Sequence, residues 1–315
     1  MYILGFDIGG TKCSVVTAYV ENEKIRLLKK EVLSTDLEIS AYEMIDRLMD
    51  TADRLLVHTP DKIGISCGGP LDARQGVILS PPNLLGWEHI EIVKRIKERY
   101  GVAVRLQNDA NASALAEWKF GAGIGCKNMI FLTFGTGLGA GLILNGTLYE
   151  GTNGNAGEVG HIRLAEEGPV GYKKAGSFEG FCSGGGIARL GYIKAMESIR
   201  SGKYPLYFKD GMSKTDISAK SIADAAEKGD PTACEVYKVS GKFLGRGLSI
   251  LIDILNPEKI VIGSIFARSG ALLAKGMEEE LKKEALPLSL GCCRVESAKL
   301  SENLGDYAAV ATALI

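Results

Sequence analysis

The chain has 315 residues, which at roughly 150 residues per domain predicts about two domains. Hydrophobic residues make up 46% and charged residues 24%, a globular composition that excludes a disordered chain or a coiled coil. Lys and Arg number 37 against 38 Asp and Glu, so we expect no nucleic-acid partner and no membrane partner. Glycine is the outlier at 40 residues, and its uses are tight turns and close approach to ligands.

The chain start and the cysteines predict a cytoplasmic protein. Residues 1–12 lack the basic region of a signal peptide and run directly into a strand-like segment. The most apolar run, Leu248 to Leu255, is far shorter than the roughly 18 residues that cross a bilayer, and it contains Asp253. The seven cysteines are scattered without a C-x-x-C pair, so we expect neither a disulfide framework nor a thiolate metal site.

The first 120 residues alternate between short apolar segments and amphipathic ones. Two strands, Tyr2–Asp7 and Cys13–Tyr19, are predicted on either side of a glycine turn, Gly9 to Lys12. A further strand is predicted at Ile25–Val32, and apolar residues at helical spacing predict a helix at Ala41–Val57. A strand, a helix, a strand and a helix are then expected at Lys62–Ser66, Ile90–Tyr100, Val102–Leu106 and Ala110–Phe120.

The next part of the chain begins like the first. Apolar segments Asn128–Phe134 and Ala140–Leu144 flank the glycine turn Gly135–Gly139, which makes a weak internal repeat. Glycine-rich sequence from Gly146 to Gly186 predicts long loops. Strands are predicted at Lys259–Ile262 and Arg294–Ala298, and helices at about 187–200, 218–228, 232–255, 270–284 and 302–314. From the pattern alone we place a domain boundary near residue 110.

Each glycine turn is a candidate phosphate site. Consecutive backbone N–H groups in such a turn form a concave anion site, and the missing Cβ lets phosphate approach. A single turn favours an ordinary hairpin, but two equivalent turns, each with a hydroxyl (Thr11 and Thr136), favour phosphate binding. The second turn matches neither the dinucleotide fingerprint, which opens a helix, nor the Walker loop. We therefore expect a nucleotide phosphate held between two β-hairpins.

Two aspartates stand next to strand ends. Asp7 ends the first strand beside the first turn, where a carboxylate can hold Mg²⁺ next to phosphate oxygens, directly or through water. Asp109 follows a strand and opens a helix, a place where an isolated carboxylate points into a cleft. Taken alone, Asp109 is as readily the N-cap of that helix.

A third group of polar residues suits a sugar. Glu158 and His161 are three residues apart among glycines, and Glu179 follows in another glycine-rich loop. Together with the carboxamide of Asn108 they offer the many donors and acceptors that a sugar needs. Taken singly, each is more often a surface polar residue than a ligand contact.

Four motifs occur in the order and spacing of the ROK family (repressor, open reading frame, kinase), which this chain resembles over nearly its whole length. They are Asp7 to Lys12, Asn108 to Asn111, Gly135 to Gly141 and Glu158 to His161. Gly69-Pro70, Asn83 to Trp87 and Asn256-Pro257 ahead of the Ile260–Ile262 strand add to the resemblance. It implies an α/β protein with the actin-like ATPase (ribonuclease H-like) fold, two α/β domains and an interdomain cleft. The N-terminal domain would be 1–110 plus 300–315, and the C-terminal domain 111–299.

The resemblance also implies an activity, because kinases of this family transfer the γ-phosphate of ATP to a sugar hydroxyl. It implies an ATP- and Mg²⁺-dependent, glucokinase-like enzyme acting on a hexose or an N-acetylhexosamine. The general base would be Asp109. The nucleotide would be bound by Asp7, Gly9, Gly10, Thr11, Lys12, Gly135, Thr136, Gly137 and Gly263. The sugar would be bound by Gly69, Asn83, Asn108, Asp109, Glu158, His161 and Glu179.

Two departures from the family pattern are visible. Many members carry three cysteines in the segment matching Val170 to Glu179, and these bind structural zinc with a histidine that matches His161. Here all three cysteines are replaced, so we expect no zinc site and His161 is left for the sugar. Where the family often has two glycines near adenosine, this chain has Gly263 and Ser264.

Two other functions are compatible with the resemblance. The family includes sugar-responsive regulators with an N-terminal winged helix-turn-helix, but here the first phosphate turn begins by residue 9 and no basic patch replaces that domain. A catalytically silent sugar-binding protein is the other, and the retained Asp109 argues against it. The sequence identifies neither the sugar nor its hydroxyl, and glucose is the first choice from family frequency. ATP is preferred to polyphosphate because no basic track is evident, and a homo-oligomer (dimer or tetramer) is expected from the family.

Overall fold

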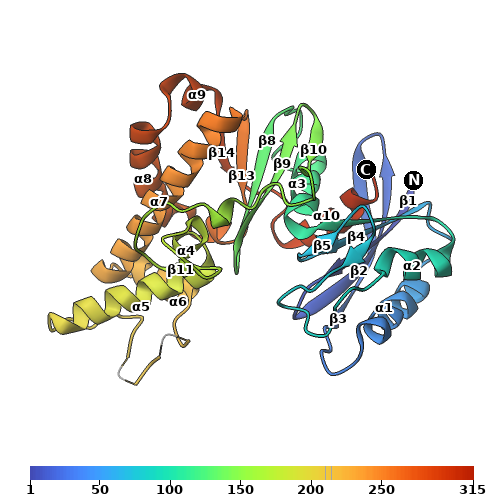
Figure 1. Cartoon of the computed structure of the whole chain (residues 1–315), viewed down its shortest axis with the longest axis horizontal. Helices are drawn as coiled ribbons and strands as arrows, with labels where there is room; N and C mark the ends of the chain where they lie inside the picture. Colours follow the sequence, from blue (N-terminus) through green and yellow to red (C-terminus); the bar gives the residue numbers. More distant parts are fainter. Residues whose placement is uncertain (210, 214) are drawn as a thin grey trace. The chain divides into compact units, whose positions relative to one another are not determined.

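The structure, a computed structural model, describes residues 1–209, 211–213 and 215–315 (Figure 1). Its contacts divide the chain into two compact units. Unit 1 contains Met1–Lys127, Gly141–Ala156 and Lys299–Ile315, and unit 2 contains Asn128–Ala140 and Gly157–Ala298. These units are defined by their internal contacts. The predicted domains, 1–110 plus 300–315 and 111–299, stay a prediction.

The sheet of unit 1 has the strand order β3-β2-β1-β4-β7. Strand β1 pairs antiparallel with β2 and parallel with β4, and β4 pairs parallel with β7. The carboxyl ends of β1, β4 and β7 therefore lie at one edge of the sheet, where ligands bind in open α/β sheets. The strands are β1 (Tyr2–Ile8), β2 (Lys12–Glu21), β3 (Lys24–Ser34), β4 (Lys62–Cys67) and β7 (Ala103–Asn108).

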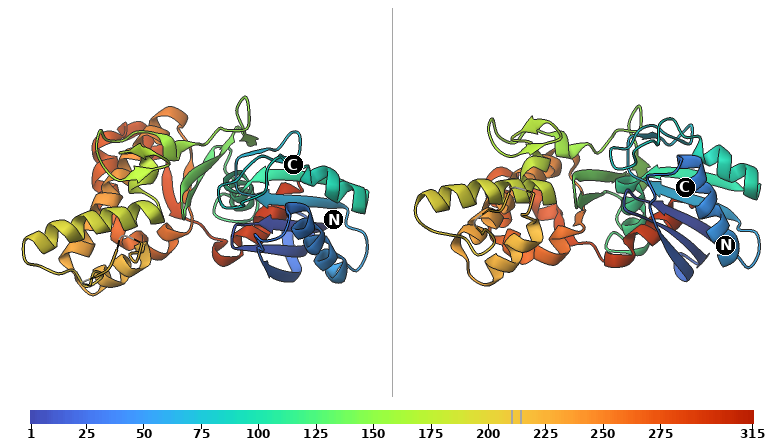
Figure 2. Two further views of the ribbon diagram at one scale, coloured as in Figure 1. Left: turned by 60° about the horizontal axis from the view of Figure 1, so that its bottom comes forward. Right: turned by 90° about the horizontal axis from the view of Figure 1, so that it is seen from below.

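Helices cover both faces of this sheet because its buried strands are apolar on both sides. On one face, Leu48 of α1 (Ala41–Leu55) and Ile96 of α2 (Ile92–Tyr100) join the core around Phe6. The other face is covered by α10 (Leu304–Thr312), next to α3 (Asp109–Phe120). Figures 1 and 2 show α10, in red, against the blue strands from the other end of the sequence.

The second large sheet has the order β10-β9-β8-β13-β14. Strand β13 pairs parallel with both β8 and β14, and β10 pairs antiparallel with β9. The predicted repeat of strand, glycine turn and strand is confirmed, as β1–β2 and as β8–β9. The bounds are β8 (Met129–Phe134), β9 (Leu138–Leu144), β10 (Thr147–Tyr149), β13 (Lys259–Ile262) and β14 (Arg294–Ser297).

The helices of unit 2 are α4 (Phe178–Phe181), α5 (Gly184–Arg200), α6 (Ala219–Glu227), α7 (Pro231–Leu255), α8 (Ile265–Glu284) and α9 (Pro287–Cys292). The sequence pattern predicted α5, α6 and α7, whereas α8 begins earlier than expected and has a non-helical residue, Ser269, that breaks its periodicity. The short helix α9 was not predicted. In the described part of the chain, no helix combines the length and apolar character needed to cross a bilayer.

The segment 146–186, predicted as long loops, contains short ordered elements in addition to β10 and α4. They are the two-stranded sheet of β11 (Val170–Gly171) and β12 (Lys174–Ala175) and the 3₁₀ helix η1 (Val159–His161). Elements this short have no periodicity to read in a sequence. Elsewhere, β5 (Leu71–Asp72) pairs with β6 (Val77–Ile78), and a second 3₁₀ helix, η2 (Ser301–Asn303), precedes α10.

Candidate active site

The predicted carboxylates of unit 1 meet at the carboxyl edge of its sheet. Asp7 lies near the end of β1 opposite Ser66 of β4, and Asn108 ends β7 opposite Cys67. Asn108 is the N-cap of α3, with its side chain accepting a hydrogen bond from Ala110 N at 2.9 Å. Asp109 is therefore not the cap, and it is exposed in the first turn of the helix.

Asp7 is surrounded by other carboxyl groups. Burial raises the pKa of its carboxyl to about 6; a hydrogen bond with Ser66 opposes this, and the charges of Asp109 and Asp306 raise the pKa further. The charge of Lys30 lowers it. Lys30 Nζ lies 2.6 Å from Asp306 Oδ2, and Ser14 Oγ donates to Asp306 Oδ1 at 3.0 Å. Carboxylate oxygens are the ligands that a hard cation such as Mg²⁺ prefers.

The first glycine turn presents two consecutive amides. Gly9 N donates to Lys12 O at 3.1 Å and closes the turn. Within the described ranges, no acceptor is hydrogen-bonded to Gly10 N or to Thr11 N, which follow it. This is the arrangement that binds anions in backbone concavities. Thr11 and Lys12 are exposed beside these amides.

Two candidate sugar residues of unit 1 lie against the first glycine turn or against Asn108. The backbone of Asn83 packs so closely on Gly10 that a Cβ at position 10 would lie 2.7 Å from Asn83 Cβ. At Gly69 a Cβ would lie 3.1 Å from Asn108 Nδ2. Close approach of Asn83 thus requires glycine at position 10, whereas a Cβ at position 69 would only crowd the Asn108 amide. Unit 1 thereby brings together Asp7, Gly9 to Lys12, Gly69, Asn83, Asn108 and Asp109.

The second glycine turn, like the first, presents two consecutive backbone amides. Gly135 N donates to Gly137 O at 3.1 Å, and Gly184 N, at the start of α5, donates to Gly135 O at 2.7 Å. Among the residues that the structure describes, none accepts from Thr136 N or Gly137 N. The side chain of Ser264, next to Gly263, lies 3.7 Å from where a Cβ of Gly135 would stand.

Glu179, predicted as a sugar residue, contacts this second turn. Its Oε2 accepts a hydrogen bond from Leu138 N at 3.2 Å and would lie 2.9 Å from a Cβ at Gly137. The segment from Glu158 to His161 is next to it, because a Cβ at Gly160 would be 3.3 Å from Glu179 Cβ. Unit 2 thus brings together Gly135 to Gly137, Gly263 and three predicted sugar residues, Glu158, His161 and Glu179.

The segment where the family's cysteines would lie is a hairpin held by hydrogen bonds. Lys174 Nζ on β12 donates to His161 O at 2.8 Å, and an Arg163 guanidinium N–H donates to Ala175 O at 2.8 Å. The Tyr172 ring stands edge-on to the His161 ring, with centroids 6.1 Å apart. Between residues 1 and 315, leaving aside 210 and 214, no three His, Cys, Asp or Glu residues gather as metal ligands.

Sequence reasoning missed several residues that touch these predicted ones. Asp306 carried a readable signal, because it is an acidic residue in the otherwise apolar helix α10 and is buried there. Ser66, Lys30 and Thr35 carried none. Their roles follow from strand register and packing, which bring distant segments together.

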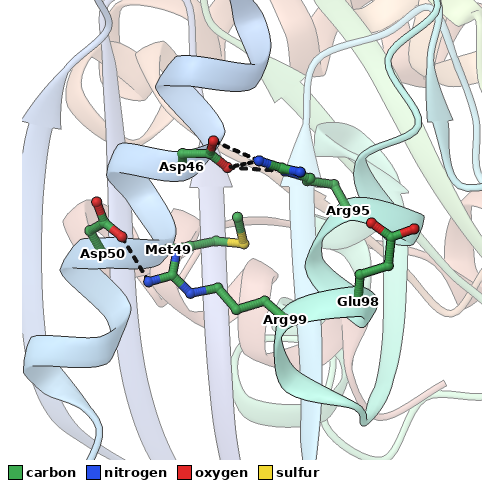
Figure 3. A pocket seen from close by; sticks show the side chains of 6 residues that line it. All are labelled: Asp46, Met49, Asp50, Arg95, Glu98 and Arg99. Carbon is green, nitrogen blue, oxygen red and sulfur yellow. Dashed lines mark hydrogen bonds and ion pairs between the residues drawn. The ribbon is translucent and has the colours of Figure 1, made fainter.

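A charged groove of about 450 Å³ lies between α1 and α2, away from these residues (Figure 3). Arg95 pairs with Asp46 at 2.7 Å, and Arg99 with Asp50 at 2.7 Å. None of the predicted site residues lines this groove. Both of its arginines are paired with aspartates, so we assign it no ligand.

Comparison with known proteins identifies the class. The chain is 32% identical over 312 residues to a glucokinase from Halalkalibacterium halodurans, covering 96% of this chain and 92% of that protein. The structure is similar to that of a ROK family glucokinase from Streptomyces griseus in complex with glucose and AMPPNP, with a TM-score of 0.77, 29% identity and coverage of 100% and 99%. The chain is also 31% identical over 253 residues to the DNA-binding transcriptional dual regulator NagC of Escherichia coli, covering 79% of this chain and 59% of the regulator.

The fold is accordingly the actin-like ATPase (ribonuclease H-like) α/β fold. A model of the ROK family matches residues 3–314, and the chain belongs to this family, as its motifs predicted.

Proposed function

We propose that the protein is a sugar kinase that transfers the γ-phosphate of ATP to a hydroxyl of a hexose or an N-acetylhexosamine. The observation that carries the proposal is the pair of glycine turns, each with two consecutive amides that have no acceptor in the described chain. A nucleoside triphosphate such as ATP has several linked phosphate groups, so it offers one to each of the two turns. The relatives named as glucokinases support glucose as the first sugar to test.

Each predicted residue has a role in this reaction. Asp109 would accept the proton of the attacking sugar hydroxyl. Asn108, Asn83, Gly69, Glu158, His161 and Glu179 would hold the sugar, and Gly9 to Lys12 and Gly135 to Gly137 the phosphates. Gly263 would lie beside the adenosine.

Mg²⁺ fits the half-buried Asp7 carboxyl, because the negative charges of Asp109 and Asp306 act on it and a cation would offset them. Asp7 would hold the ion, directly or through water. When bound, Mg²⁺ offsets the negative charge of the phosphates. The protein's own part is to keep the carboxylate at the end of β1, beside the first turn.

The test is a coupled assay of ADP release with ATP, Mg²⁺ and a panel of sugars, beginning with glucose and N-acetylglucosamine. We expect sugar-dependent ADP release with at least one of them, and none with Mg²⁺ omitted. Replacing ATP by polyphosphate should abolish turnover. Sugar binding by calorimetry without any ADP release would instead support the catalytically silent binding protein, or the regulator suggested by the resemblance to NagC.

We also propose a cytoplasmic location and a homo-oligomer, a dimer or a tetramer, with no nucleic-acid or membrane partner. The near-neutral net charge of −1 supports the last point, because nucleic-acid binding depends on clustered positive charge. Light scattering of the purified chain would measure the oligomeric state.

A further inference from the structure

Thr35 stands directly after β3 and reaches the first phosphate turn through its backbone. Residues Lys12 and Ser34 are opposite each other in the β2–β3 ladder. The ladder continues one residue further, because Thr35 N donates to Thr11 O at 3.0 Å. The half-buried Thr35 is thereby fixed beside the turn.

Its side chain makes a second bond to the same turn. Thr35 Oγ1 donates to Gly9 O at 2.6 Å. The buried thiol of Cys13 lies 3.3 Å from that hydroxyl and donates to Gly9 O over a longer distance, 3.8 Å, so the threonine hydroxyl makes the shorter hydrogen bond to this carbonyl.

The bond to Gly9 O matters because a peptide group is planar and trans. The C=O of Gly9 and the N–H of Gly10 belong to one peptide and point in opposite directions. This peptide lies between two glycines, so its plane can rotate at little steric cost unless something holds it. Fixing Gly9 O inward therefore directs the Gly10 N–H outward, and this is one of the two amides without an acceptor in the described chain.

We propose that Thr35 is a positioning residue for the nucleotide phosphates, whose hydroxyl holds the Gly9–Gly10 peptide so that the Gly10 amide faces the ligand. The proposal rests on the kinase function proposed above and adds a residue that no motif contains. Asn83 also packs closely on this turn, at Gly10.

The test compares Thr35→Val, which removes the hydroxyl at constant shape, with Thr35→Ser, which keeps it. The matched control is Thr17→Val in β2, because the Thr17 hydroxyl is buried and has no hydrogen-bond partner among the described residues. The readouts are the Kd of AMPPNP with Mg²⁺ by calorimetry, the KM for ATP and the KM for the sugar.

We expect Thr35→Val to weaken AMPPNP binding and raise the ATP KM by about five- to ten-fold, the value of one hydrogen bond, with the sugar KM unchanged. Thr35→Ser should lie within about two-fold of the wild type and Thr17→Val should equal it. If Thr35→Val proves unstable, Thr35→Ala must show the same loss of nucleotide affinity.

Wild-type affinity in Thr35→Val, or a serine variant as weak as the valine one, would overturn the proposal while leaving the kinase function intact. A parallel rise of both KM values would also overturn it, since that indicates a general structural role. A wild-type protein that binds no AMPPNP would overturn the kinase function, and this proposal with it.

Discussion

Asp7 and Asp109 differ in surroundings although both stand at the carboxyl edge of one sheet. Asp109 is exposed, whereas Asp7 is half-buried, and the charges of Asp109 and Asp306 act on its carboxyl. A base that must reach a substrate hydroxyl needs the first setting, and a cation ligand suits the second. The two carboxylates should therefore respond differently to replacement by an amide.

Asp109→Asn removes the proposed base while keeping shape and polarity. We expect kcat to fall by about 10²–10⁴, the usual contribution of a positioned base. Sugar affinity measured by calorimetry should change little, because the amide still forms hydrogen bonds. Wild-type turnover in this variant would show that the base assignment is wrong.

Asp7→Asn should stabilise the metal-free protein at neutral pH although it removes activity. The pKa of Asp7 is raised from 3.8 to about 6 in the folded chain, so its ionisation opposes folding. The wild type should lose stability as the pH rises from about 4 to about 6, and the loss stays constant above that.

Asp7→Asn should raise the free energy of unfolding by up to about 3 kcal/mol at pH 8, and by close to zero near pH 4. Urea unfolding in EDTA at both pH values measures it. Asn in place of the exposed Asp224 serves as the control and should show no such dependence. Equal stability of Asp7→Asn and wild type at pH 8 would contradict the prediction.

At the scale of elements, the β11–β12 hairpin takes the place of the family's cysteine segment. The hairpin contacts the candidate sugar site through the ring of Tyr172 and through a hydrogen bond from Lys174 Nζ to His161 O. Lys174→Met should raise the sugar KM by about two- to ten-fold, the range for one lost bond, with kcat and the ATP KM unchanged. The neighbouring exposed Lys173 provides the control, Lys173→Met, which should match the wild type.

Metal content completes that test. We expect no zinc in the dialysed protein and no effect of a zinc chelator on either variant. About one zinc per chain by elemental analysis would contradict the view that hydrogen bonds alone hold this hairpin.

At the scale of the whole molecule, unit 1 is built from both ends of the chain, because the C-terminal helix α10 packs on strands β1 and β4. Helix α10 lies so near β4 that a Cβ at Gly64 would be 2.6 Å from Ala313 N and would also collide with the Ala309 backbone. Gly64→Ala should therefore cost about 2–3 kcal/mol of unfolding free energy in urea. Gly68→Ala, with nothing within 4 Å of its new methyl, should cost far less.

Because α10 packs on β1 and β4, Asp306 of this helix lies near enough for its charge to act on Asp7. Loss of α10 packing should therefore affect the candidate site as well as the stability of the protein. We expect the ATP KM of Gly64→Ala to rise at temperatures well below its melting point. An unchanged ATP KM in a clearly destabilised variant would show that packing of α10 and the nucleotide site are independent.

Much of this molecule could be predicted from the sequence because the signals are local. Apolar runs ending in glycine turns identified both hairpins, helical spacing identified α1 and α7, and four short motifs identified the family. Most candidate residues lie in these motifs, since each motif is a continuous segment, whereas Gly69, Asn83, Glu179 and Gly263 came from the wider resemblance to the family.

Only the tertiary structure decided which distant side chains contact the residues of those motifs. Ser14 and Asp306 are 292 residues apart, and Thr35 and Gly9 are 26 apart, so no local pattern relates them. Glu179 reaches Leu138 N across 41 residues, a contact that its predicted role in sugar binding does not suggest. These hydrogen bonds depend on strand register and on the packing of α10, which are set when distant apolar faces are buried together.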